Sequence, residues 1–562
     1  MRELSNFYAT VRIGDCSYQF SDRIVTEDFD AQLIIDGVRV RLDVQPKCDE
    51  EYYEGVRLIR PMSFDTLAIT ARTKVCESDR VFVNGYQSWT DSREYEPHEK
   101  MTGIDHIPKA IVKKYNFDKY GDYNFAGYSG RAGDFHGFSY GYIRQGEEYN
   151  LFGSLNERDG FTLIRVRSKD NEISFEKDCE GADYTEPFTA LEIAAFSGDE
   201  KTVFDKLFEQ LGIKCRPAKP ISGYTSWYRH YQDISEDKLL HDLEGVADAV
   251  GIDIFQIDDG YQRGVGDWLK IDAKKFPHGM KYISDKIHEK GLMSGLWLAP
   301  FVCEKNSYVF RHLNHLLLRD KNGELVPAGC NWSGSYVLDI FHPETQAYLA
   351  MVFDRVLNVW GFDMVKLDFL YAACIIPHNG MSRGRVMYEA MRMLREMCGD
   401  KLILGCGVPL ASAFGVVDYC RIGCDVGLSW NDNMLMQLTH RERVSTKNSI
   451  HNTIFRRQLD KRAFLNDPDV FLLRDENIKL TGIQKQALGI VNDLFGSVYF
   501  TSDDMQAYND KQKRVLAFVK SLRGCEYEGV DVKDGVITFT YTRNGKKTTA
   551  QLLGNGCIHV KK

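Results

Sequence analysis

The sequence lacks long apolar runs, paired cysteines and a leader-like N-terminus. Nowhere does it approach the roughly 18 consecutive apolar residues of a transmembrane helix, and residues 1–7 lack the apolar core of a secretory signal. Its 14 cysteines are scattered and include no Cys-x-x-Cys pair, so zinc-ligand spacing is missing and free thiols are expected. These absences predict a cytoplasmic protein in a reducing compartment, without a membrane partner.

An excess of positive charge is also missing. The chain has 71 Lys and Arg against 80 Asp and Glu, for a formal net charge of -9. This balance argues against nucleic acid or an anionic membrane as the main partner, although the substrate itself need not be charged. No metal or nucleotide motif occurs, so we expect no cofactor and no metal, and the oligomeric state is not given by the sequence.

The pattern of apolar and polar residues changes along the chain. Its length of 562 residues predicts two or three domains. Residues 1–200 alternate apolar and polar positions with turn dipeptides between them, as at 40–44, 67–71, 81–83 and 161–166. This pattern predicts a large N-terminal β-sandwich. Residues 201–220 are expected to form a helix over 201–211 and a proline-containing linker.

Residues 221–504 alternate strand-like and helix-like segments. Helices are expected at 236–250, 280–290, 383–398 and 481–494, and 304–342 is too long for a βα loop, so it is expected to cross the barrel mouth. The eight expected strands, which fit a (β/α)8 TIM barrel, are 221–227, 252–258, 292–300, 362–369, 401–407, 417–421, 463–465 with 470–473, and 497–501. Residues 505–562 return to alternation, with strands expected at 514–519 and 536–541, and predict a small C-terminal β-domain.

The fourth expected strand carries two charges in an otherwise apolar run. Lys366 and Asp368 are two residues apart, so they face the same side of the strand near its carboxyl end, where barrel enzymes hold catalytic groups. A purely structural Lys–Asp pair is the alternative.

Other polar residues follow the ends of neighbouring strands. Asp258 and Asp259 end the second strand, Trp297 lies in the third, Cys406 lies near the end of the fifth, and the sixth leads through Arg421 to Asp425. Asp368 and Asp425 lie two βα units apart and project from one rim. Two facing carboxylates are the minimum apparatus of glycoside hydrolysis.

The order and spacing of these motifs resemble the α-galactosidases of glycoside hydrolase family 36, from about residue 80 to about 505. The resemblance implies an N-terminal β-supersandwich, a catalytic barrel, a C-terminal β-domain and a retaining exo-glycosidase for terminal α-D-galactosides. The matching stretches are 84–89 (Asn-Gly-Tyr-Gln-Ser-Trp), 256–262 (Gln-Ile-Asp-Asp-Gly-Tyr-Gln), 295–300 (Gly-Leu-Trp-Leu-Ala-Pro), 365–368 (Val-Lys-Leu-Asp), 405–410 (Gly-Cys-Gly-Val-Pro-Leu) and 421–425 (Arg-Ile-Gly-Cys-Asp).

By this resemblance Asp368 matches the nucleophile and Asp425 the general acid/base. We expect Lys366 to lower the pKa of Asp368, and apolar neighbours such as Val426 or Trp430 to raise that of Asp425. The alternative for Asp425 is a loop cap. Family members commonly have proline where this chain has a cysteine directly before Asp425, which leaves the positioning of the acid/base open.

The resemblance also implies a set of sugar contacts. Asp258 and Asp259 match acceptors for the 4- and 6-hydroxyls, Lys366 and Arg421 match donors, and Trp297, Trp89 and Cys406 match residues that line the sugar, Trp89 reaching in from the N-terminal domain. Taken by residue type alone, Trp89 also fits an aromatic core and Cys406 a core thiol.

Alternative functions stay open at this point. An α-N-acetylgalactosaminidase uses the same scaffold, a Schiff-base lyase could be centred on Lys366, and a catalytically silent carbohydrate-binding protein is a third possibility. The expected partners are α-galactoside oligosaccharides or glycoconjugates.

Overall fold

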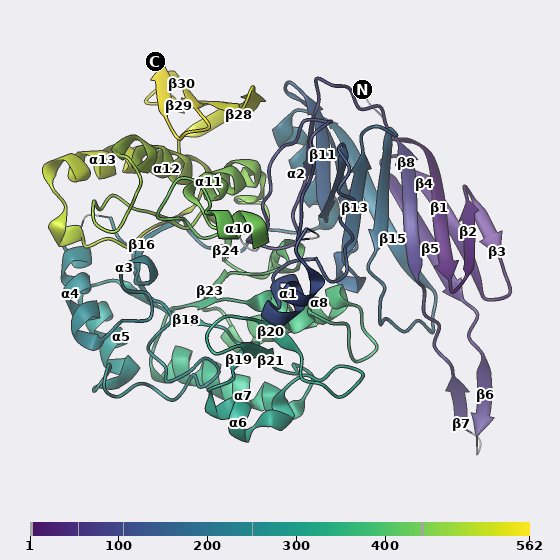
Figure 1. The fold of residues 1–562 in the computed structure, drawn as a ribbon, viewed down its shortest axis with the longest axis horizontal. Coiled ribbons are helices and arrows are strands. Elements are labelled where there is room, and N and C mark those ends of the chain that lie inside the picture. Colours follow the sequence, from purple (N-terminus) through teal and green to yellow (C-terminus); the bar gives the residue numbers. More distant parts are fainter. Residues whose placement is uncertain (1–3, 54–55, 105, 250, 440–442, 562) are drawn as a thin grey trace.

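The computed structural model describes residues 4–53, 56–104, 106–249, 251–439 and 443–561. It shows a β-sandwich, a (β/α) barrel and a small C-terminal sheet, which confirms the predicted fold class (Figure 1). The sandwich lies against one side of the barrel, and the C-terminal sheet lies over the barrel helices α12 (Gly482–Phe495) and α13 (Asp510–Lys520).

The N-terminal sandwich consists of two antiparallel sheets. In β5 the side chains of Val40, Leu42 and Val44 alternate inward, because a period of two places them on one face of the strand. The first sheet has the order β10 (Asp134–Phe138), β13 (Thr162–Arg167), β14 (Glu172–Lys177), β8 (Thr66–Arg72), β1 (Ser5–Ile13), β2 (Cys16–Phe20). The second has the order β3 (Arg23–Val25), β4 (Phe29–Asp36), β5 (Arg39–Pro46), β15 (Phe188–Gly198), β12 (Glu148–Ser154), β11 (Tyr140–Gln145), β9 (Arg80–Val83).

The barrel strands are parallel and short. The two end strands of the sheet, β25 and β26, are separated by only two residues and pair with β24 and β27 respectively, so they act as halves of one seventh strand and the sheet closes. The strand order is β25 (Leu465–Asp467), β24 (Tyr419–Arg421), β23 (Leu402–Gly405), β22 (Met364–Leu367), β18 (Met293–Leu298), β17 (Ile254–Ile257), β16 (Ile221–Thr225), β27 (Val498–Thr501), β26 (Val470–Phe471).

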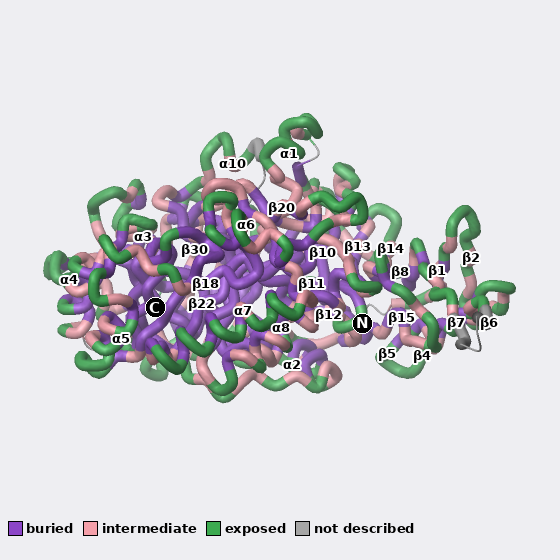
Figure 2. Tube along the Cα trace, turned by 90° about the horizontal axis from the view of Figure 1, so that it is seen from below, coloured by how far each residue is buried: buried purple, intermediate pink, exposed green. Residues whose placement is uncertain are grey.

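Helices between the strands cover the outside of the barrel. Many of them begin at a side chain that caps the first backbone N–H groups, as Ser382 does for α8 and Thr481, in a capping box with Gln484, does for α12. The chain-order helices are α2 (Glu200–Leu211), α4 (Glu236–Ala247), α5 (Gly279–Glu289), α7 (Pro343–Asp354), α8 (Arg383–Cys398), α11 (Thr446–Phe455) and α12. Their apolar faces meet the strands, so the buried region is densest inside the barrel (Figure 2).

The long segment after β18 folds as a unit of its own. It forms a small antiparallel sheet of β19 (Val302–Glu304), β21 (Ser335–Val337) and β20 (Pro327–Gly329), with the short helix α6 (Tyr308–His312) between β19 and β20. Its own apolar cluster is centred on Cys303, Val309 and Leu338. The segment is therefore an ordered excursion with a packed interior.

The C-terminal region corrects one prediction. Residues 514–519, expected as a strand, lie in helix α13, which Asn509 and Gln512 begin with a capping box. The residues Lys-Gln-Lys-Arg inside it are strong helix formers, and the local alternation is too short to outweigh them. The four-stranded sheet that follows consists of β28 (Glu526–Lys533), β29 (Val536–Arg543), β30 (Lys546–Leu552) and β31 (Ile558–Lys561).

No helix among the described ranges is long and apolar enough to cross a membrane.

Candidate active site

Asp368 lies at the carboxyl end of β22, whose four residues are all buried. Its carboxylate accepts a hydrogen bond from Trp297 Nε1 at 3.0 Å, and the Cys406 thiol also donates to it. The next residue, Phe369, has a φ of 55°, and its backbone N–H donates to Asp368 Oδ1 at 2.9 Å. The side chain is thus held by donors from three neighbouring strands and is only 8% exposed.

The environment of Asp368 corrects the predicted direction of its pKa. Burial raises the pKa of Asp368 above its ordinary value, and the charge of Lys366 and the two side-chain hydrogen bonds only oppose this effect. Lys366 does lower the pKa of Asp368, as expected, but desolvation of the buried carboxylate outweighs this one nearby cation, so the net shift is upward. Lys366 is also engaged elsewhere.

Lys366 forms a buried ion pair with Asp258, its Nζ lying 2.7 Å from Asp258 Oδ2. Burial lowers the pKa of Lys366, but the charges of Asp258 and Asp368 together with Cys406 raise it, so the pKa lies above the ordinary value. The amine is therefore held as an ammonium ion. Schiff-base formation needs a neutral amine, so this geometry opposes the lyase alternative.

Asp259 is surrounded by neutral donors. Its Oδ2 accepts from Gln232 Nε2 at 2.7 Å and from Trp332 Nε1 at 2.9 Å, and its Oδ1 accepts from Gln262 Nε2 at 2.5 Å. Burial raises the pKa of Asp259, and these hydrogen bonds oppose it. Because Trp332 belongs to the excursion between β20 and β21, its contact confirms that the excursion reaches the barrel mouth.

Asp425 follows β24 and differs from Asp368 in exposure and in its partner. Its side chain is 38% exposed, and its Oδ1 lies 2.9 Å from Arg421 Nη1. Besides this cationic partner, Asp425 has the buried Val426 as its neighbour in the chain, and the indole of Trp430 donates to the carbonyl of Gly554 in the C-terminal domain. Asp425 is still near enough to Asp368 for its charge to raise the pKa of Asp368.

Arg421 is buried and is shared by three aspartates. Besides Asp425, its Nε lies 3.1 Å from Asp467 Oδ2 and its Nη2 lies 2.8 Å from Asp469 Oδ1. Asp469 also accepts from the Tyr228 hydroxyl and, at 2.8 Å, from the backbone N–H of Val426. Burial raises the pKa of Asp469 to about 6, with Arg421 opposing the shift.

This cluster was missed from the sequence. The sequence signal that could have revealed it is the acidic run Asn-Asp-Pro-Asp at 466–469. The structure shows that this run joins the two halves of the seventh strand, and that Asp469 connects it to the loop carrying Asp425.

The N-terminal segment 84–89 enters the barrel rim. Trp89 packs edge-on against Phe369 at 5.2 Å and Tyr371 at 5.8 Å, ring centroid to centroid. A Cβ on Gly407 would lie 2.8 Å from the Trp89 ring, so the loop after β23 accepts the indole only because that position is glycine. The prediction that Trp89 reaches the barrel from the sandwich is confirmed by these contacts.

Arg456, which follows α11, holds this segment in place without any carboxylate partner. The guanidinium is fully buried and donates to the carbonyls of Ser88 at 2.7 Å and Ile422 at 2.9 Å, and to Gly85, Gln87 and Asn84 Oδ1 at 3.0–3.1 Å. Burial lowers its pKa to about 10. One side chain thus connects the segment carrying Trp89 to the loop that leads to Asp425.

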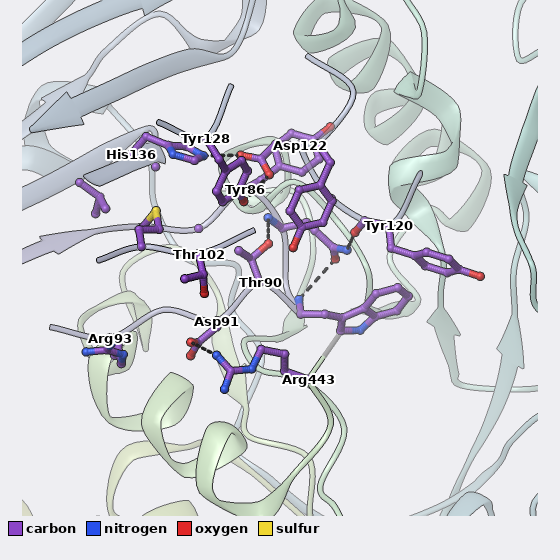
Figure 3. A pocket seen from close by; sticks show the side chains of 18 of the residues that line it. Tyr86, Thr90, Asp91, Arg93, Thr102, Tyr120, Asp122, Tyr128, His136 and Arg443 are labelled. Carbon is purple, nitrogen blue, oxygen red and sulfur yellow. Dashed lines mark hydrogen bonds and ion pairs between the residues drawn. The ribbon is translucent and has the colours of Figure 1, made fainter. Parts of the chain in front are cut away.

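A cavity of about 70 Å³ lies behind the same segment (Figure 3). Trp89 and Tyr120 border it, and on its far side the His136 ring and the Tyr128 hydroxyl both contact Asp122, each at 2.9 Å. Of the predicted site residues only Trp89 lines this cavity, so it is separate from the carboxylates.

All nine predicted site residues lie on the barrel rim or against it. Eight come from β17, β18, β22, β23 and β24 or directly follow them, because parallel strands present their carboxyl ends at one edge, and Trp89 comes from the sandwich. Within the described parts of the chain, no three His, Cys, Asp or Glu side chains are grouped to hold a metal ion.

Known proteins that are similar to this chain include several α-galactosidases. The family model described as Melibiase matches residues 214–395. The α-galactosidase Mel36A of Lactobacillus acidophilus is 25% identical over 226 residues, which cover 38% of this chain but only 30% of that relative.

Solved structures match over a longer range. The α-galactosidase TtGalA from Thermus thermophilus, determined in complex with p-nitrophenyl α-D-galactopyranoside, has a TM-score of 0.70 and 25% identity, covering 89% of this chain and 98% of that one. The family 36 α-galactosidase AgaA from Geobacillus stearothermophilus shares the fold at 12% identity, with a TM-score of 0.58, covering 98% and 79%. In its sequence motifs, in the segment matched by the family model and in its fold, the chain is similar to the melibiase group of glycoside hydrolases and to the α-galactosidases of family 36.

Proposed function

We propose that the protein is a retaining exo-glycosidase that hydrolyses terminal α-D-galactosides through a glycosyl-enzyme intermediate. The observation that carries the proposal is the pair Asp368 and Asp425, which lie at the ends of β22 and β24 on one rim and are close enough to interact electrostatically. Two carboxylates roughly 5 to 5.5 Å apart are what a retaining mechanism requires.

Asp368 suits the nucleophile. It is buried, its orientation is set by Trp297 and Cys406, and no ion pair to it is formed within the described parts of the chain, so its oxygen can attack an anomeric carbon. The raised pKa makes the carboxylate of Asp368 a stronger base. The positive charge that develops on the sugar in the oxocarbenium-like transition state stabilises this anion.

Asp425 suits the acid/base. Its 38% exposure lets water reach it for the second step, while Arg421 fixes its position from the strand below. In the first step it gives a proton to the leaving oxygen, and in the second it takes one from the attacking water. Because an α-linked substrate is displaced twice, the first product is the α-anomer.

The sugar specificity rests on the acceptors at the end of β17. Asp258 is neutralised by Lys366, and Asp259 has neutral donors only, so both can accept hydroxyl hydrogens from a sugar in a buried place. A buried acceptor left unpaired by the wrong epimer is costly, which favours galactosides over glucosides. An N-acetylated sugar on the same scaffold is the competing substrate.

The decisive test is an initial-rate panel of p-nitrophenyl α-galactoside, α-N-acetylgalactosaminide and α-glucoside, with proton NMR of the first product. Preference for the galactoside and release of its α-anomer are expected. Preference for the N-acetylated sugar would move the assignment to that substrate, and β-anomer as first product would refute retention.

A further inference from the structure

Trp332 occupies an unusual backbone position at the mouth of the barrel. It lies between β20 and β21 with a φ of 54°, in the left-handed region that bulky residues rarely adopt. Its indole donates to Asp259 Oδ2 at 2.9 Å, and its ring packs against Phe369 at 4.9 Å and Trp297 at 6.2 Å. A strained residue of this kind persists only where its surroundings fix it.

What fixes Trp332 is a tyrosine of the other domain. The Tyr120 hydroxyl accepts from the backbone N–H of Cys330 at 2.7 Å and donates to Asn331 Oδ1. A Cβ on Gly329 would lie 2.4 Å from the same oxygen, so the hydroxyl rests directly on the backbone of this loop. Three consecutive residues before Trp332 are thus held by one side chain that is 3% exposed.

Tyr120 is itself tied to the segment that carries Trp89. Gln87 Nε2 donates to the Tyr120 carbonyl at 2.5 Å, and Gln87 Oε1 accepts from the backbone N–H of Trp89 at 3.3 Å. Figure 3 shows Tyr120 beside this segment, at the edge of the cavity. The N-terminal domain therefore places two aromatic side chains at the site, Trp89 directly and Trp332 through Tyr120.

The hydrogen bonds of Asp259 show what Trp332 does there. A carboxylate has about four acceptor positions. Gln232 and Trp332 occupy Oδ2 and Gln262 occupies one position of Oδ1, so a single position on Oδ1 remains for a ligand. The indole thus determines both how many hydroxyls Asp259 can accept and from which oxygen.

We infer that Trp332 is a specificity-determining residue for the sugar substituent that Asp259 binds, and that Tyr120 is its positioning residue from the N-terminal domain. The inference rests on the proposed glycosidase function. One acceptor position remains on Asp259, and the ring of Trp332 lies beside it. A sugar whose substituent at this place carries one hydroxyl can donate to that position. A sugar without the substituent makes no such hydrogen bond and binds more weakly. Loss of the indole N–H frees Oδ2 to water and reduces the discrimination.

The test compares p-nitrophenyl α-D-galactopyranoside with p-nitrophenyl β-L-arabinopyranoside, which lacks only the hydroxymethyl arm. Trp332→Phe keeps the ring and removes the N–H, so the ratio of kcat/KM for the two substrates should fall by about ten-fold, mainly through KM for the galactoside. Tyr120→Phe should lower the ratio in the same direction by less. Trp360→Phe, outside the barrel mouth, is the matched control and should leave the ratio unchanged.

The outcomes separate this inference from the function it rests on. If wild type cleaves the galactoside but Trp332→Phe lowers kcat/KM for both substrates by the same factor, Trp332 is structural and the inference is overturned. If wild type cleaves neither, the proposed function fails, and calorimetric binding of D-galactose against L-arabinose decides the inference instead. A ratio of affinities that drops in Trp332→Phe supports it, and an unchanged ratio overturns it.

Discussion

The ends of β22 and β24 present the same side chain, an aspartate, in opposite environments. Asp368 is buried among an indole, a thiol and the backbone N–H of Phe369, whereas Asp425 is partly exposed and bound to a guanidinium that two further aspartates share. Burial raises the pKa of Asp368, whereas Asp425 lies beside a cation and in partial contact with solvent.

This difference shows that position on a strand does not set the chemistry of a carboxylate. The neighbours do so, through desolvation, hydrogen bonds and charge. For the proposed mechanism the division is useful, since the nucleophile must be kept from water and the acid/base must meet water in the second step. Substitutions at or near one aspartate therefore test one of the two environments at a time.

Removal of the buried carboxylate should have the largest effect. Asp368→Gly should lower kcat for an aryl α-galactoside by about four orders of magnitude or more, because no glycosyl-enzyme can form. Azide can fill the space left and attack the face opposite the leaving group, so galactosyl azide of β configuration should appear. An active Asp368→Gly variant without azide would remove Asp368 from the chemistry.

Removal of the exposed carboxylate should depend on the leaving group. Asp425→Ala should lower kcat/KM for an oligosaccharide by about 10² to 10⁴, the usual range for general acid catalysis, and much less for a nitrophenyl galactoside. Azide attacks the β-linked intermediate from the other face and should give the α-azide. Equal losses on both substrates would contradict the acid/base role, and the same azide anomer from both variants would contradict the pairing.

Truncation of Trp89 should have a smaller effect on activity than removal of either aspartate. Trp89→Ala removes the ring packed on Phe369, directly after Asp368, and should lower kcat/KM about ten-fold or more while costing about 3 kcal/mol of stability. Trp89→Phe should recover most of both. Initial rates and thermal unfolding of the two variants provide the measurement, and unchanged kinetics in a folded Trp89→Ala variant would show that the sandwich does not complete the site.

The sequence was sufficient for the barrel and for the placement of eight of the nine residues on its rim, because buried parallel strands leave a periodic signal and polar residues at their ends stand out, whereas Trp89 was placed by the resemblance alone. The sequence was insufficient to predict what surrounds these side chains in the folded protein. Desolvation of Asp368 and the three aspartates around Arg421 arise from packing between strands far apart in the sequence, which no local pattern records.

Trp332 and residues 514–519 show two other limits. Trp332 lies in the excursion, where its role depends on a tyrosine more than 200 residues earlier in the chain. Residues 514–519 were expected as a strand from a short apolar alternation, but they lie in α13, where a capping box and a run of helix-forming residues outweigh that alternation.

The smallest expected effect concerns Asp469, a buried carboxylic acid that shares Arg421 with Asp425. Its pKa is raised by burial from the ordinary 3.8 to about 6, so the folded chain binds a proton that the unfolded chain releases. Its contribution to stability is therefore fully present below about pH 3.8, is lost as the pH rises through about 6, and is constant above that. Asp469→Asn removes this titration.

Relative to wild type, Asp469→Asn should gain on the order of 2 kcal/mol in unfolding free energy between pH 4 and pH 7, on top of a constant offset for the altered contact with Arg421. Thermal unfolding midpoints measured across this range should show the difference between the two proteins moving in favour of the variant up to about pH 6 and then levelling off. A difference that stays flat through the window would mean that Asp469 is already ionised in the folded protein at low pH, and that the Arg421 cluster, unlike the surroundings of Asp368, overcomes the cost of burying a carboxylate.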